Sequence, residues 1–308
     1  MTKPVISYIS ALYNKADVVL QTLTCLRNQT DIDPEAVELI FCDDASSDGS
    51  VEVLQAEARK DHRIKLITND RNVGPSIRLN QAAEMAQGSY ILPIDADDLL
   101  PQNATAILMN CIKKYNVPLV FGETKRGLNC TNISATAKVL KADDALAFCA
   151  KRQIVHMGFL VEKEIWRAAS GANEKVFIQD QSLPLRLSME ASKLAYIEDT
   201  VYWLRPANGD NLSRNKIQQH HDRFFSLLPL LGNEKASAAA HDAMMRQIIS
   251  TLWKLRRDGG KPLPHMSWAF IRYMLNRSLS YTLSDQSLVG MSEKLRQLPE
   301  IRRPDSEA

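Results

Sequence analysis

Short apolar segments alternate with amphipathic segments over the first two thirds of the chain, and this alternation restricts the fold more than any other feature. Four apolar segments rich in β-branched and aromatic residues predict strands, over residues 5–12, 37–42, 64–68 and 90–94. Between them, apolar residues recur at intervals of three or four, which is typical of helices that pack on one face. Strands that alternate with helices of this length indicate an α/β fold with a mostly parallel sheet.

Acidic residues directly follow two of these predicted strands. Asp43 and Asp44 come after the second strand, and Asp95, Asp97 and Asp98 come after the fourth. Ligands of open α/β sheets bind beyond the carboxyl ends of the strands, so the two acidic groups are candidates for one site. In an extended segment residues i and i+2 point to the same side, so Asp95 and Asp97 are expected to face one pocket and to suit a hard divalent cation. The alternative is a strand-to-helix turn in which Asp97 or Asp98 caps the helix.

Neither acidic group is accompanied by a glycine-rich phosphate loop of the G-x-G-x-x-G or G-K-[ST] type. The ordinary dinucleotide-binding and P-loop classes therefore lack their phosphate cradle. The five cysteines are widely spaced and form no C-x-x-C pair, so neither a zinc site nor a disulfide framework is expected. We expect most of them to be buried residues of a protein from a reducing compartment.

The sign of the charge changes along the chain. Residues 1–213 carry a net charge of −4 and residues 214–308 one of +6, which predicts one domain over 1–213 and a basic, helical C-terminal region over 214–308. That region is either an appendage packed on the first domain or a basic amphipathic surface that meets anionic lipid. No segment approaches the roughly 20 apolar residues of a membrane span. We expect a cytoplasmic protein, at most peripheral to the inner face of the membrane, with no nucleic-acid partner.

Four motifs follow one another in an order and spacing that are more specific than any one of them alone. They are VISYISALYNKADVVLQTLTCLRNQT, VELIFCDDASSDGS, NDRNVGPSIRLNQAAEMAQGSYILPIDADD and GANEKVFIQDQSLPLRL. Over residues 4 to about 213, this arrangement resembles the inverting GT-A glycosyltransferases of family 2. The resemblance implies a Rossmann-like, mostly parallel sheet with flanking helices, to which the α-helical C-terminal region is added as an extension.

The resemblance also implies an activity and a set of donor-binding residues. The expected enzyme moves a sugar from a nucleotide-diphosphate donor, with UDP-sugars favoured, to a hydroxyl of a glycan or glycolipid acceptor in polysaccharide or lipopolysaccharide synthesis. Asp43 or Asp44 would hold the nucleotide base, and Arg78 would lie near the base or the phosphates. Asp95 would contact the ribose region, and Asp97 would bind Mn²⁺ or Mg²⁺ at the diphosphate.

Asp180 falls on the position of the family's catalytic base. A sugar hydroxyl is a poor nucleophile at neutral pH, so a base must take its proton during the attack. One carboxylate opposite the leaving group implies a single displacement with inversion. Gln179 stands where the family usually has a glutamate, which would affect how the acceptor is held but not the base itself. Ala207 or Asn208 stands where the family often has a histidine, so a metal ligand from that loop is not expected.

Two other classes of function remain open at this stage. A sugar-phosphate nucleotidyltransferase also places carboxylates and a metal on an α/β sheet, but it usually has a glycine-rich, basic loop after the first strand, and this chain has ALYNKADV there. A nucleotide- or glycan-binding module without catalysis would account for the neutral Gln179 and the absent histidine. The nucleotidyltransferase would differ from a glycosyltransferase in the reaction that it catalyses. The binding module would catalyse no reaction.

Overall fold

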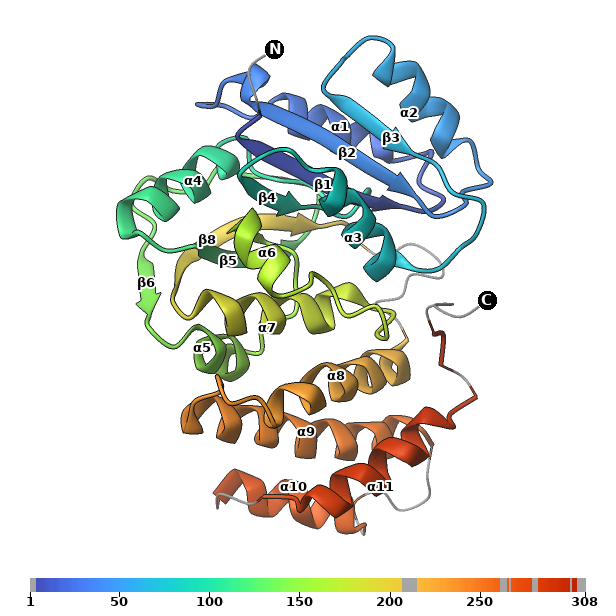
Figure 1. Cartoon of the computed structure of the whole chain (residues 1–308), viewed down its shortest axis with the longest axis vertical. Coiled ribbons are helices and arrows are strands. Elements are labelled where there is room, and N and C mark those ends of the chain that lie inside the picture. The colour runs from blue at the N-terminus through green and yellow to red at the C-terminus, as the bar shows by residue number, and fades with distance from the viewer. Residues whose placement is uncertain are drawn as a thin grey trace.

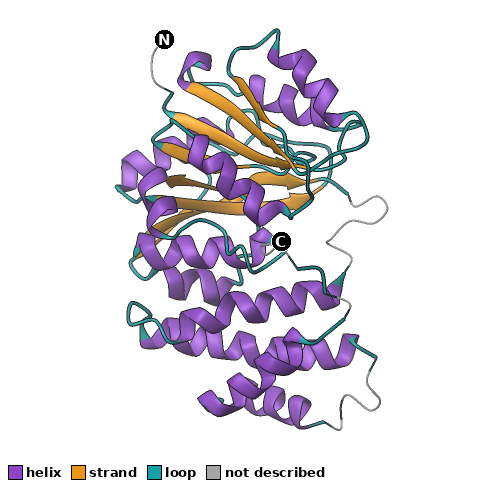
Figure 2. Ribbon diagram, turned by 45° about the vertical axis from the view of Figure 1, so that its right-hand side comes forward, coloured by secondary structure: helices purple, strands orange, loops and turns teal. Residues whose placement is uncertain are grey.

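The computed structural model describes residues 4–206, 215–260, 265, 267–278, 282–299 and 301–303. One eight-stranded sheet, with the order β3-β2-β1-β4-β7-β5-β8-β6, forms the centre of the upper part of the molecule (Figure 1). Its strands are β1 Ile6–Leu12, β2 Val37–Asp43, β3 Ile64–Ile67, β4 Tyr90–Pro93, β5 Leu119–Arg126, β6 Val139–Ala142, β7 Phe159–Glu162 and β8 Leu194–Leu204. Helices lie on both faces of this sheet (Figure 2), so the fold is the α/β type that the alternating pattern predicts.

The first four strands are parallel, and their order determines where a ligand can bind. The chain runs from β1 outward to β2 and β3 and then returns to place β4 on the other side of β1. The strand order therefore reverses between β1 and β4, and such a switch point opens a crevice at the carboxyl ends of the strands. The second half of the sheet is mixed, because β7 pairs antiparallel with both β4 and β5 and β6 pairs antiparallel with β8.

The helices of the first 200 residues surround the sheet, and those that follow form a separate stack. The first group comprises α1 Val19–Arg27, the 3-10 helix η1 Pro34–Ala36, α2 Ser50–Ala58, α3 Pro75–Met85, α4 Ala104–Tyr115, α5 Ala145–Arg152, α6 Lys163–Ala168 and α7 Gln179–Ala191. The stack comprises α8 Lys216–Leu231, α9 Ala238–Asp258, α10 Trp268–Ser278 and α11 Asp285–Arg296. It lies beyond α5 and α7 on the side of the molecule away from β3 (Figure 1). Within the described part of the chain, no helix is long and apolar enough to cross a membrane.

The sequence of residues 123–138 suggests a loop or irregular hairpin and that of residues 154–161 a strand, and both predictions are wrong in detail. Strand β5 continues to Arg126 inside the first segment, and β6, which the sequence does not suggest, begins just after it. The apolar segment 154–161 forms a strand only from Phe159 onward. Both β5 and β6 pair with β8, and β5 does so with register shifts at Glu123. Such irregular pairing gives no clear alternation of apolar and polar residues, so the sequence pattern does not report it.

A buried carboxylate connects the amino-terminal ends of three strands to the turn before β4. Glu38 in β2 accepts hydrogen bonds from Ser7 Oγ at 2.5 Å and Lys65 Nζ at 2.6 Å, on the two neighbouring strands. It also accepts the backbone N–H groups of Gln87 and Gly88, at 2.6 and 3.0 Å, just before β4. Burial opposes ionisation, but these donors outweigh it, and the pKa of Glu38 is lowered. This one side chain thus fixes the start of the strand that leads to Asp95.

Replacing this carboxylate tests its contribution to stability. Glu38→Gln keeps the volume but points an amide N–H₂ at donors, so we expect the free energy of unfolding to fall by about 2–3 kcal/mol at pH 7. Because the folded-state pKa is lowered, the stabilisation is complete above the unfolded pKa of about 4.3 and is lost as the pH falls through the folded value. Urea unfolding of both proteins at pH 7 and pH 3.5 measures this difference.

The matched control is Glu35→Gln in η1, where the side chain is 60% exposed. We expect it to change the free energy of unfolding by less than about 0.5 kcal/mol, because exposed charges contribute little. A loss for Glu38→Gln no larger than this control, or a loss that is equally large at pH 3.5, would contradict the role of the buried carboxylate.

Candidate active site

A cavity of about 660 Å³ opens at the carboxyl ends of β1, β2 and β4 and extends to the first turn of α7. Its lining combines carboxylates with basic, polar and aromatic side chains. The acidic members are Asp44, Asp95, Asp97, Asp98 and Asp180, and the basic members are Lys15, Arg126, Arg205 and Arg302. The cavity thus brings together side chains from Ala11 to Arg302, which lie at opposite ends of the chain. Its position is the one expected for the binding site of an open α/β sheet.

The turn that follows β4 is held by α1 on one side and by β8 on the other. The strand ends at Pro93, and Asp98 N–H bonds the carbonyl of Asp95 at 3.0 Å, so the segment does not stay extended. Asp95 and Asp97 nevertheless both line the cavity, through the turn and not through strand alternation. On one side Thr22 Oγ1 of α1 bonds the carbonyls of Ala96 and Asp98, at 3.1 and 2.9 Å. These contacts fix the backbone that carries the acidic side chains.

Asp98 does not cap a helix, so the alternative in which this residue is a helix cap is wrong. The cap residue of α4 is Asn103, and Asp98 is buried beside β8 with 4% of its surface exposed. Its Oδ1 accepts the backbone N–H of Arg205 at 2.7 Å, and the Tyr202 hydroxyl also bonds its carboxyl. The same hydroxyl accepts the N–H of Asp95 at 2.9 Å. Burial, followed by the charges of Asp95 and Asp97, raises the pKa of Asp98 to about 8.

Asp95 is held by the residue at which the chain departs from the family pattern. Gln179 Nε2, at the start of α7, donates a hydrogen bond to Asp95 Oδ1 at 3.0 Å. Burial, followed by the neighbouring charge of Asp97, raises the pKa of Asp95 to about 7, against the opposing effects of Lys15 and Gln179. A glutamate in place of Gln179 would add another negative charge at this distance. The neutral amide therefore suits a site that already crowds carboxylates.

Asp97 is paired with a cation that the sequence analysis did not single out. Lys15 Nζ, in the loop after β1, lies 2.5 Å from Asp97 Oδ2, and the two side chains are 27% and 19% exposed. In the described part of the chain, no three His, Cys, Asp or Glu side chains are arranged to hold a metal ion. A divalent ion fits here only with one or two carboxylates from the protein and further oxygens from phosphate and water, which is the usual arrangement for Mg²⁺.

Asp180 lies in the first turn of α7, where the helix N-terminus favours a negative charge. Gln181 Nε2 donates a hydrogen bond to Asp180 Oδ1 at 3.2 Å. Burial, followed by the charge of Asp95, raises the pKa of Asp180 to about 7, and Arg223 of α8 opposes this shift. A carboxyl with a pKa near neutral is suited to taking up and releasing a proton at physiological pH.

The start of α7 is positioned by the C-terminal helices. Asp222 of α8 is 1% exposed, and its Oδ2 accepts the backbone N–H of Ile178 at 2.9 Å, immediately before α7. Arg223 donates to the carbonyl of Gln181 at 3.1 Å. Pro184 lies in the second turn of α7. The helix that carries Asp180 therefore depends on α8 for both its orientation and its charge balance.

Asp44 and Arg78 form an ion pair with each other, whereas Asp43 accepts a hydrogen bond from the N–H of Ser46. Asp44 accepts the N–H groups of Val73 and Gly74 and the Nε of Arg78, all at 2.8–2.9 Å. Arg78 also donates to Gln81 and to a backbone carbonyl, and it does not line the cavity. Asp43 is 2% exposed and is absent from the lining, and its Oδ1 has no partner among the described atoms. Of these three expected donor-binding residues, the structure brings only Asp44 to the cavity.

Two arginines reach the cavity from the part of the chain after β8. Arg205 follows β8 directly and donates from Nε to the carbonyl of Asp97 at 2.7 Å. Arg302 comes from the C-terminal segment, and its guanidinium lies 4.5 Å from the centre of the Phe177 ring. The Arg302 N–H also bonds Gln218 Oε1 of α8 at 2.8 Å. Ala207 and Asn208, where a histidine was not expected, lie outside the described residues.

The chain matches the model of a known family and resembles solved structures. Residues 7–159 match the family described as glycosyl transferase family 2. An uncharacterised glycosyltransferase of Haemophilus influenzae is 29% identical over 168 residues, which are 53% of this chain and 64% of that protein. The chain thus matches less than two thirds of this relative's length.

Two solved structures share the fold at 15% sequence identity. TarS 1–349 of S. aureus, in complex with UDP-GlcNAc, has a TM-score of 0.67, and the alignment covers 95% of this chain and 92% of that one. The mannosyltransferase PcManGT of Pyrobaculum calidifontis, in complex with GDP-Man and Mn²⁺, has a TM-score of 0.64 with 97% and 82% covered. The strand order and the acidic turn after β4 are consistent with the family match. This chain is a member of glycosyltransferase family 2, with a GT-A fold.

Proposed function

We propose that this chain is an inverting glycosyltransferase that moves a sugar from a nucleoside-diphosphate sugar to a hydroxyl of a glycan or glycolipid acceptor. The expected setting is the synthesis of a polysaccharide, lipopolysaccharide or related glycoconjugate. One observation carries the proposal: Asp97, beyond β4, and Asp180, at the start of α7, line a single cavity at the switch point of the sheet. One carboxylate can serve the leaving diphosphate and the other the attacking hydroxyl.

The donor half of the cavity has the groups that a nucleoside diphosphate needs. Tyr13 is 44% exposed and lines the cavity, so its ring can stack on a nucleobase. Lys15 and Arg205 place positive charge next to Asp97, where the diphosphate would lie. Asp95 and Asp97 would hold Mn²⁺ or Mg²⁺ together with the phosphate oxygens. The bound ion would stabilise the negative charge that develops on the leaving diphosphate. The complexes of the two structural neighbours, with UDP-GlcNAc and with GDP-Man and Mn²⁺, support this class of donor.

The acceptor half contains the group that activates the nucleophile. Asp180 would accept the proton of the acceptor hydroxyl as the hydroxyl oxygen bonds to the anomeric carbon and the bond to the diphosphate breaks. A single displacement of this kind inverts the anomeric configuration. Gln181 holds Asp180 in place, and Arg223 favours its ionised form. The transition state is expected to have oxocarbenium character, as in glycoside hydrolysis.

A nucleotidyltransferase remains the second enzyme class, and the loop after β1 argues against it. That loop contributes Tyr13, Asn14 and Lys15 to the cavity and contains no glycine. A backbone phosphate cradle needs glycines at which the chain can approach the ligand closely. Release of pyrophosphate from a nucleoside triphosphate and a sugar phosphate would identify the second class. Release of a nucleoside diphosphate from a nucleotide-sugar identifies the first.

Asp97→Ala tests the donor half of the cavity. We expect Mn²⁺-dependent binding of UDP to be lost and transfer to fall by at least about 10²-fold, the scale of one lost electrostatic stabiliser of the transition state. The fold should survive, because a partly exposed pair such as Lys15 and Asp97 contributes about 1 kcal/mol or less. Isothermal titration with UDP, with and without Mn²⁺ or EDTA, measures the binding, and a nucleotide-release assay measures the transfer.

The control is Asp17→Ala, an exposed residue in the turn before α1. It should leave both UDP binding and transfer unchanged. Normal turnover by Asp97→Ala, or wild-type UDP binding that EDTA does not alter, would contradict the metal role of Asp97 and would leave Lys15 as the cation that serves the diphosphate.

Asp180→Asn tests the base. We expect UDP to bind within about twofold of wild type while transfer falls by about 10² or more, the usual effect of losing a general base. A base acts in its ionised form, and the pKa of Asp180 is about 7. The wild-type kcat/KM for the acceptor should therefore be constant above about pH 8 and fall about tenfold per pH unit below about pH 6. Initial rates between pH 5 and 9 measure this profile.

Asp143→Asn, at an exposed position before α5, serves as the charge-matched control and should keep both rate and profile. Equal losses of UDP binding and transfer in Asp180→Asn would indicate that Asp180 only supports the fold. A wild-type rate that stays flat from pH 8 down to pH 5.5 would contradict its role as the base.

A further inference from the structure

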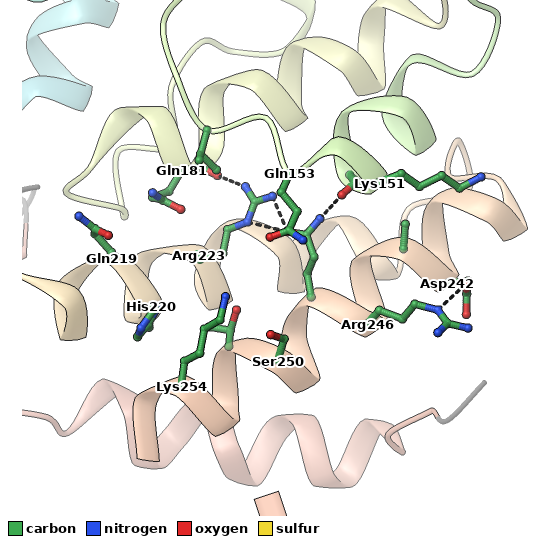
Figure 3. Close-up of a pocket in the computed structure, with 15 residues that line it drawn as sticks. Lys151, Gln153, Gln181, Gln219, His220, Arg223, Asp242, Arg246, Ser250 and Lys254 are labelled. Atoms are coloured by element: carbon green, nitrogen blue, oxygen red, sulfur yellow. Dashed lines mark hydrogen bonds and ion pairs between the residues drawn. The ribbon is translucent and has the colours of Figure 1, made fainter. Parts of the chain in front are cut away.

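A second cavity, of about 450 Å³, lies between α5, α7, α8 and α9 (Figure 3). Three residues line both this cavity and the active-site cavity: Val155, Gln181 and Gln219. The two spaces are therefore neighbours that meet at Gln181, the residue next to Asp180 in the chain. A volume of this size accommodates a ligand of the size of one or two sugar residues. We call it the side cavity.

The side cavity is lined by a buried guanidinium that has no carboxylate partner in the described part of the chain. Arg223 is 6% exposed and donates to Gln247 Oε1 at 2.8 and 2.5 Å and to the Gln181 carbonyl at 3.1 Å. These acceptors are all neutral. Buried charges in proteins are normally paired with an opposite charge, because desolvation of an unpaired charge is costly. The charge of Asp180 acts on Arg223 only through space, because Gln181 contacts both residues and the two side chains form no ion pair in the described part of the chain.

A second cation lines the same space without an ion pair among the described residues. Lys254 rises from α9 toward the side of the cavity on which Gln219 and Arg223 lie (Figure 3). The carboxylates nearby are already engaged: Asp242 with Arg246, at 2.9 Å, and Asp258 with His220, also at 2.9 Å. The net charge of the side chains that line the side cavity is therefore positive. An anionic group bound there would gain two charge-assisted contacts.

We propose that the side cavity binds an anionic group, a phosphate or a carboxylate, that belongs to the sugar acceptor. This inference rests on the proposed function and specifies its acceptor: a glycan that carries negative charge. Asp180 lines the active-site cavity beside Gln181, which lines both cavities and connects Asp180 to Arg223 by hydrogen bonds. An acceptor whose anionic group contacts Arg223 and Lys254 would have a neighbouring sugar hydroxyl in reach of Asp180. The positive cavity thus selects and orients the acceptor, and it does not take part in the chemistry.

Binding of small probes tests the proposal without a known acceptor. Glucose 6-phosphate, glucuronate and glucose are titrated against the full chain in the presence of saturating UDP and Mn²⁺, which occupy the donor half of the active-site cavity. We expect at least one anionic sugar to bind about tenfold or more tightly than glucose, the scale of a charge-assisted hydrogen bond. Preference for the phosphate identifies a phosphate-bearing acceptor, and preference for glucuronate identifies a uronate-bearing one. Equal affinities for all three sugars overturn the proposal.

Two charge reversals locate the binding. Lys254→Glu should weaken binding of the anionic sugar about tenfold and leave the affinity for UDP within twofold. The matched control is Lys113→Glu, at an exposed position in α4, which should change neither affinity by more than twofold. Lys254 is only partly buried, so its variant is expected to fold, and Lys254→Gln provides a milder change with an intermediate effect. An anion preference that both Lys254 variants retain would overturn the assignment to the side cavity.

Failure of this inference is distinguishable from failure of the proposed function. If the wild type binds UDP and transfers sugar but shows no anion preference, the inference falls and the proposed function stands. If the wild type binds no UDP and releases no nucleotide from any nucleotide-sugar, the proposed function falls. The sugar titration can then be repeated without UDP, and it still reports whether Lys254 and Arg223 bind an anion.

Discussion

Several carboxylates crowd around one cavity, and the contacts that surround them compensate for their mutual repulsion. Asp95, Asp98 and Asp180 all have pKa values raised to near neutrality or above, chiefly by burial and then by one another's charges. Raised carboxyl pKa values mean that the fold loses stability as the pH rises through those values. The protein offsets this cost with neutral donors and cations on every side, including Gln179, Tyr202 and Lys15. The same repulsion keeps the carboxylates able to receive a cation or a proton.

The C-terminal helices belong to this electrostatic arrangement and are more than a covering layer. Helix α8 contributes Asp222, which holds the start of α7, and Arg223, which stabilises the charge of Asp180. The segment after α11 returns to the cavity, where Arg302 lies over Phe177. Their packing on α7 agrees with the appendage expected from the sequence, but they also supply contacts that the active-site helix requires. The positive charge of this region therefore serves, at least in part, the interior of the molecule.

The α/β fold and the positions of the acidic residues could be predicted because local patterns determine them. Apolar strands, helical periodicity and residues at strand ends are visible in any window of the chain. The contacts that make these residues into a site could not be predicted, because they join distant segments: Lys15 to Asp97, Gln179 to Asp95, Tyr202 to Asp98. The assignment of Asp98 as a cap was wrong for this reason. A turn that is held by hydrogen bonds from buried residues of β8 gives the same local sequence signal as a strand-to-helix connection.

The charges of the cavity also restrict how the proposed donor can enter. Lys15 already pairs with Asp97 and Arg78 with Asp44, while Asp95, Asp98 and Asp180 accept hydrogen bonds from neutral donors. A diphosphate that entered alone would add negative charge beside Asp95 and Asp97, whereas a diphosphate that entered with a divalent cation would add much less. The ammonium of Lys15 would then be released from Asp97 and could turn toward the phosphates, since both groups are partly exposed and the side chain is long. In the proposed reaction, repulsion among the carboxylates thus favours donor and cation entering together, and Asp180 remains for the acceptor.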